Sequence, residues 1–113
     1  MITFVDDALD MADKLTAAGV RATTDPGALN PPAILVPPPR LEWDVGCGYT
    51  NVWNIHAIAA APTGGDRATW DQLATLIDAL ASIYPLETAQ PTAYVLQQKT
   101  FPSYLIQFTT PGG

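Results

Sequence analysis

The sequence is poor in basic residues, in cysteine and histidine, and in long apolar runs. The chain has five Lys and Arg and eleven Asp and Glu, which gives a formal net charge of -6. An acidic protein of this kind is not expected to bind nucleic-acid phosphates independently of sequence. The single cysteine, Cys47, cannot form an internal disulfide, and no Cys/His spacing matches a zinc site. No apolar run approaches the roughly 20 residues of a spanning helix, and the N-terminus lacks the pattern of a secretory signal. We therefore expect a soluble, cytoplasmic protein with no membrane association.

Charged residues of either sign are also scarce. They make up 14% of the 113 residues, whereas hydrophobic residues make up 48%. This mix is typical of a folded domain and argues against disorder. The length predicts a single domain over residues 1–113 with one core. A surface with so few charges favours a protein that is partly covered by partners.

Residues that could carry catalysis are equally few. His56 is the only histidine, and it lies mid-strand with no Ser or Cys motif around it, which favours a structural role. Cys47 between two glycines is more simply a small turn residue, because no basic neighbour is present to activate a thiolate. Gly64-Gly65 precedes a helix but lacks the spacing of a phosphate-binding loop. We expect no catalytic, cofactor-binding or metal-ligating residue, and so no enzyme.

What the chain has in abundance is proline, with eleven residues, five of which flank one short apolar run. Ala33 to Val36 lies between Pro31-Pro32 and Pro37-Pro38-Pro39. Proline lacks the N–H that a ladder needs and fixes φ, which predicts a strand confined to about these four residues. The residue before each proline is also driven toward extended geometry, so both flanks should be stiff. Pro37-Pro38-Pro39-Arg40 resembles a polyproline ligand, but within a folded domain a structural role is favoured.

Helical spacing of apolar residues predicts two helices. The first runs from Thr3 as N-cap to Ala18, with Gly19 as a left-handed cap and an apolar stripe of Val5, Ala8, Leu9, Ala12 and Leu15. Phe4 and Met11 lie off that stripe and could face a neighbouring subunit. The second begins at Asp66 or Thr69 and ends near Tyr84, with a stripe of Trp70, Leu73, Leu76, Ile77, Leu80 and Ile83.

Strands are predicted near residues 20–23, 33–36, 40–45, 49–61, 92–97 and 104–110. In the fourth, Tyr49, Trp53 and Ile55 point one way and Val52, His56 and Ile58 the other. A strand that is apolar on both faces is central or covered by another chain. The fold class is therefore α+β, a mostly antiparallel sheet with two helices packed on one face, in the order α-β-β-β-β-α-β-β.

One series of segments points to a family. Ala-Ala-Gly-Val-Arg-Ala-Thr ends the first helix, Asp-Pro-Gly follows, and then come Asn-Pro-Pro-Ala-Ile-Leu-Val-Pro-Pro-Pro and Leu41-Glu42-Trp43-Asp44. The series resembles the small tail terminator proteins of long-tailed (siphovirus) phages that infect actinobacteria. The likeness spans most of the chain, including the Asp66-Arg67 helix and the closing strands. The resemblance rests on a short hydrophobic run with prolines on both sides, and it involves no catalytic residue.

The resemblance implies an α+β protomer that forms a homo-hexameric ring at the neck end of the virion tail, assembled in the host cytoplasm. Such a ring caps the tail tube, ends its polymerisation and docks head-completion proteins, so its partners are itself, the tail tube protein and a head-completion or neck protein. DNA would pass through an acidic lumen without specific binding. The alternatives are a neck, head-completion or other minor tail protein of the same virion, or less favourably a small ligand-binding or enzymatic domain that uses His56.

Subunit contacts are predicted in turns, because a monomer normally keeps its turns polar and exposed apolar groups mark partner sites. The segments are the turn Asp25–Asn30, the hairpin Trp43–Tyr49 and the turn Lys99–Ser103. The residues expected at the subunit interface are Asp25, Leu29, Trp43, Tyr49 and Phe101.

Overall fold

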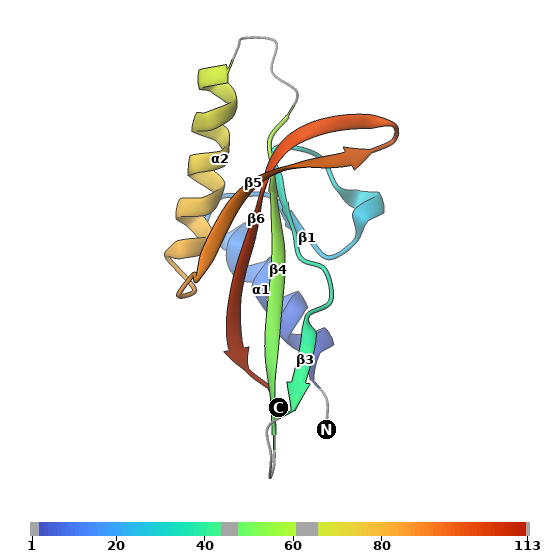
Figure 1. The fold of residues 1–113 in the computed structure, drawn as a ribbon, viewed down its shortest axis with the longest axis vertical. Coiled ribbons are helices and arrows are strands. Elements are labelled where there is room, and N and C mark those ends of the chain that lie inside the picture. The colour runs from blue at the N-terminus through green and yellow to red at the C-terminus, as the bar shows by residue number, and fades with distance from the viewer. Residues whose placement is uncertain (1–2, 44–47, 61–65, 113) are drawn as a thin grey trace.

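The computed structural model describes residues 3–43, 48–60 and 66–112, an elongated body of 52 × 25 × 25 Å. The described elements run in the predicted order, which confirms the α+β fold class (Figure 1). They are α1 (Phe4–Ala17), β1 (Ala22–Thr23), the 3₁₀-helix η1 (Pro26–Ala28), β2 (Ala33–Leu35), β3 (Arg40–Trp43), β4 (Tyr49–Ile58), α2 (Asp66–Ala81), β5 (Thr88–Leu96) and β6 (Lys99–Pro111).

The strands form one sheet in the order β1-β2-β4-β6-β5, and β3 pairs with β4 as well. Every pairing is antiparallel except that of β1 with β2, which is parallel. The central position of β4 confirms what its two apolar faces predicted. Of the predicted hairpin turn Gly46-Cys47-Gly48, Gly46 and Cys47 lie outside the described residues.

The segment with prolines on both sides, residues 31–39, interrupts the pairing along one edge of β4. Leu35 at the end of β2 pairs with His56, and Arg40 at the start of β3 pairs with Val52. The five steps from Leu35 to Arg40 therefore lie opposite only four steps, from His56 to Val52, on β4. One extra residue of this kind is what a β-bulge introduces into a strand. Val36 instead donates its N–H to the carbonyl of Thr23 at 2.9 Å. The prolines thus split what would be one long strand into β2 and β3.

Both helices lie on the same face of the sheet and cover the main core (Figure 1). On β4 the alternate residues from Tyr49 to Ala57 are buried against this layer. Trp53 is fully buried, and its Nε1 donates to Thr110 Oγ1 at 2.8 Å. The largest fully buried apolar side chains of this core are Met11, Leu15, Ile34, Trp53, Ile55, Leu80, Ile106 and Phe108.

The buried face of α1 differs from the predicted stripe. Its buried residues are Ala8, Met11, Ala12 and Leu15, whereas Val5 and Leu9 are exposed. The prediction that Met11 faces a neighbouring subunit is therefore wrong. Two sets of apolar residues with helical spacing overlap on this helix, one that includes Val5 and Leu9 and one that includes Met11. Packing on the sheet buries the set that contains the bulkier Met11.

The far ends of β5 and β6 curl over the face opposite the helices (Figure 1). β6 pairs with β4 only from Ser103 to Pro111, so the hairpin beyond Ser103 leaves the sheet. Its side chains Tyr94, Leu96 and Phe101 pack on a second small core of Leu29, Ala33, Leu35 and Ile58. The chain's own hairpin thus covers the second apolar face of β4 at this end.

The turn of this hairpin corrects the prediction of a turn at Lys99–Ser103. It lies at Gln97 and Gln98, whose φ angles are 51° and 66°, and both strands continue through a proline. Pro91 is tolerated because β5 is an edge strand. Pro102 lies just past the last pair of β6 with β4, and its carbonyl accepts the N–H of Ala59 at 2.9 Å.

Candidate functional site

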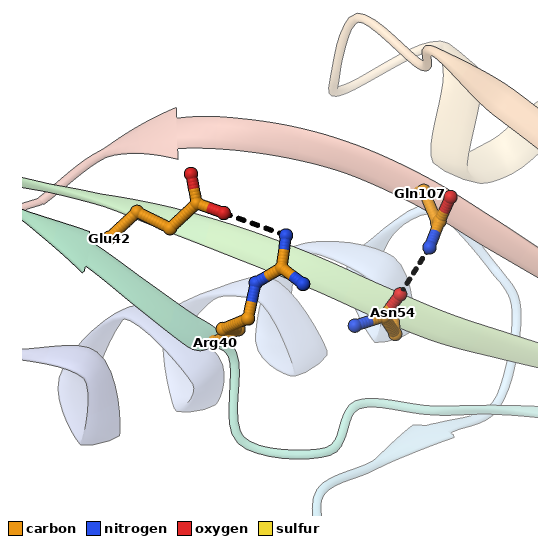
Figure 2. Close-up of polar contacts among 4 residues, drawn as sticks. All are labelled: Arg40, Glu42, Asn54 and Gln107. Carbon is orange, nitrogen blue, oxygen red and sulfur yellow. Dashed lines mark hydrogen bonds and ion pairs between the residues drawn. The ribbon is translucent and has the colours of Figure 1, made fainter.

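Polar side chains on the sheet face opposite the helices bond to one another (Figure 2). Gln107 Nε2 donates to Asn54 Oδ1 at 2.8 Å, and Thr88 Oγ1 donates to Gln107 Oε1 at 3.3 Å. Beside them, Arg40 forms an exposed ion pair with Glu42 at 2.7 Å. The ion pair is solvent-exposed, so it contributes little to stability. These contacts make this face a polar, hydrogen-bonded surface.

His56 lies on the same face, half-buried between strands. Its ring centroid is 5.3 Å from that of Tyr94, and within the described residues its Nδ1 has no hydrogen-bond partner. Burial lowers the pKa of His56, so the neutral ring is favoured at neutral pH. No Ser hydroxyl or carboxylate is hydrogen-bonded to it in that part of the chain.

The environment of His56 predicts a pH dependence of stability. Because its pKa is lower in the folded state than in the unfolded chain, the unfolded chain binds more protons as pH falls below about 6.5. The free energy of unfolding should be highest above pH 6.5 and should decline as the pH falls toward the pKa of His56 in the folded protein. Chemical denaturation of the protein between pH 7.5 and 5.0 measures this decline.

The matched control is His56→Gln, which should lose the decline over that pH range. An equal decline in both proteins would assign it to other groups. If the same substitution abolished an activity without changing stability, the structural role of His56 would be wrong.

Within residues 3–43, 48–60 and 66–112, no three His, Cys, Asp or Glu side chains gather as metal ligands would. Neither helix of that part of the chain is long and apolar enough to cross a membrane. The surface features that stand out there are exposed large apolar side chains. Val5 is 59% exposed, Leu9 48%, Trp43 63% and Trp70 69%.

One apolar surface, here named the α1 ridge, is formed by Val5 and Leu9, one turn apart on α1. A shallow groove of about 160 Å³ beside them is lined by Phe4, Val5, Ala8, Leu9, Thr24, Val36 and Pro38. The stiff segment after β2 thus forms the far wall of this surface. The ridge lies at the β1–β2 side of the sheet.

A second apolar surface, here named the α2 groove, lies between α2 and the β5–β6 hairpin at the opposite side of the sheet. Its volume is about 490 Å³, and its lining is Trp70, Leu73, Ala74, Ile77, Pro91, Thr92, Pro102, Ser103 and Tyr104. Trp70 is predicted from the helical stripe to be core, yet it lies exposed at this groove. The ridge and the groove therefore occupy opposite edges of one protomer.

Comparison of the chain with protein-family models, with curated proteins and with solved structures finds no match. The function must therefore be inferred from this chain's own residues and their arrangement.

The predicted interface residues lie in different environments. Trp43 is exposed, with its ring centroid 5.7 Å from that of Tyr49. Asp25 is exposed, and its carboxylate caps η1 by accepting the Gly27 N–H at 2.9 Å. Tyr49 and Leu29 are buried within the protomer, and Phe101 is half-buried in the second core. Contact of these five residues with a neighbour stays a prediction, and it is physically best supported for Trp43.

Sequence reasoning missed Val5, Leu9 and Trp70 as surface residues, since each fits a helical stripe. One signal was present in α1. Its apolar positions span more of the helix than one face of a sheet can cover, because Met11 adds to a stripe that already holds five residues. A surplus of this kind indicates a second contact surface.

Proposed function

We propose that the protein is a structural virion protein, a phage tail terminator whose copies form a ring on the end of the tail tube. The observation that carries this proposal is the pair of exposed apolar surfaces, the α1 ridge and the α2 groove, at opposite edges of one protomer. Two different surfaces at opposite edges favour head-to-tail contact, which closes into a ring when the rotation per subunit permits. The proline-clamped segment that resembles terminator proteins also forms a wall of one of these surfaces.

The charge distribution is compatible with a ring around DNA. α1 carries four aspartates against one lysine, and the Lys14 ammonium pairs with Asp10 at 3.0 Å. α2 adds Asp71 and Asp78 on its exposed side. A ring that turns this acidic helix layer toward its lumen would repel phosphates and let DNA pass without sticking. In this proposal the partners are other copies, the tail tube protein and a head-completion protein.

The test uses the full chain together with a purified phage tail tube protein that assembles into tubes. We expect light scattering or negative-stain images to show a ring on one end of assembled tubes, and an excess of the protein to stop tube elongation. A protein that stays monomeric and does not bind tubes at tens of micromolar would overturn the proposal. Binding to the head-side ring alone would reassign it as a neck or head-completion protein.

A further inference from the structure

We infer that the α1 ridge of one copy seats in the α2 groove of the next copy, and that this contact is the repeating joint of the assembly. The inference rests on the proposed self-assembly and assigns the surfaces that perform it. Its occupant is a second copy of this chain. The joint is heterologous, since each copy would contribute its ridge to one neighbour and its groove to the other.

The shapes of the two surfaces match as convex and concave partners. Val5 and Leu9 stand out from α1 with about half or more of each side chain exposed. The α2 groove is about three times larger than the hollow beside the ridge, at about 490 against about 160 Å³. The larger hollow of the groove has room for the side chains that the ridge presents. An isologous contact of two ridges or of two grooves would leave the larger hollow unfilled.

The charge of the chain favours this pairing. Each copy carries a formal net charge of -6, so two copies repel each other and approach best where carboxylates are absent. The residues that line the shallow groove beside the α1 ridge and those that line the α2 groove include no charged residue. Other exposed parts of the helices present Asp6, Asp13, Asp71 and Asp78. The two apolar edges are thus the places where an acidic copy can meet another with the least repulsion.

The joint also gives Trp70 a role. This side chain is 69% exposed in the single copy, and it forms the rim of the groove beside Ala74 and Ile77. Tryptophan is among the residues that contribute most to subunit contacts when it becomes covered by a partner. Seating of Val5 and Leu9 against its ring would remove three exposed large apolar side chains from water at once.

Disulfide cross-linking between two separately labelled proteins tests this pairing. In a Cys47→Ser background, one protein carries Leu9→Cys and the other carries Ala74→Cys, an exposed residue of the groove. We expect mild oxidation of the mixture to yield roughly tenfold more dimer than either protein alone, because the joint raises the effective concentration of the two thiols. A single chain with both substitutions should give a ladder of covalent oligomers.

The control is Thr109→Cys, which places a thiol on the exposed sheet face away from both surfaces. Mixed with either partner, it should give only the dimer yield of random collision. The inference is overturned if Leu9→Cys alone cross-links as well as the mixture, or if the mixture yields no more dimer than the control. If wild-type rings still form on tail tubes in that case, only the joint is wrong and the proposed function stands.

Discussion

Replacing Val5 and Leu9 together by aspartate is expected to abolish ring formation on tail tubes while leaving the protomer folded. Both side chains are largely exposed in the single copy, so their replacement removes little from the core. In the assembly each would place an unpaired carboxylate in an apolar contact, which costs at least about 2 kcal/mol. Two such groups should weaken each joint by on the order of 1,000-fold. Counting of capped tubes in negative-stain images and the sedimented mass of the free protein measure this loss.

The matched control for this variant is Val95→Asp. Val95 is 67% exposed on the β5–β6 hairpin and lines neither the shallow groove beside the α1 ridge nor the α2 groove. The same change in chemistry should therefore leave assembly near the wild-type level. If Val95→Asp disrupts rings as strongly as the double ridge variant, general charge repulsion explains the loss and the ridge has no special role.

Replacing Trp53 by alanine is expected to destabilise the protomer by about 3–5 kcal/mol. The side chain is fully buried at the centre of the helix-facing core, and the substitution leaves a large cavity. It also removes the Nε1 donor that bonds Thr110 Oγ1 at 2.8 Å. Since domains of this size are stable by only about 5–15 kcal/mol, much of the protein would unfold on mild heating. Urea denaturation followed by far-ultraviolet circular dichroism measures the loss.

Trp70→Ala is the matched control, since it removes the same side chain from an exposed site. We expect a change in unfolding free energy within about 0.5 kcal/mol, together with weaker ring formation. The two tryptophans thus separate stability from assembly. A loss of stability from Trp70→Ala that approaches that of Trp53→Ala would show that α2 depends on the groove rim for its packing, and would count against a free docking surface.

The sequence predicted the elements with the strongest local signals. The prolines on both sides of Ala33–Val36 confine β2 for a covalent reason, since they cannot donate to a ladder. The alternation of Trp53 and Ile55 with Val52 and His56 predicted that β4 would be central. Thr3 and Gly19 marked the bounds of α1, and Gly19 has φ 95° as a left-handed cap should. In each case the deciding interaction lies within a few residues of the pattern.

Other features depended on segments far apart in the chain. Two prolines lie within long strands for reasons that only the sheet decides: Pro102 lies just past the end of the β6–β4 pairing, and Pro91 lies on the edge strand β5. The second core under the hairpin joins Leu29 to Tyr94 and Phe101. Such contacts have no local period, so hydropathy cannot reveal them.

For the α1 ridge and the α2 groove too, some features follow from local sequence and others depend on distant parts of the chain. The sequence by itself determined an α+β fold class with few charges, a proline-confined strand and more apolar helix positions than one core needs. Only the tertiary structure decided that Met11 is covered, and that Val5, Leu9 and Trp70 are left outside. The physical reason is that helical periodicity fixes which residues share a face, whereas the rotation of a helix on its sheet is set by packing volume contributed by distant strands.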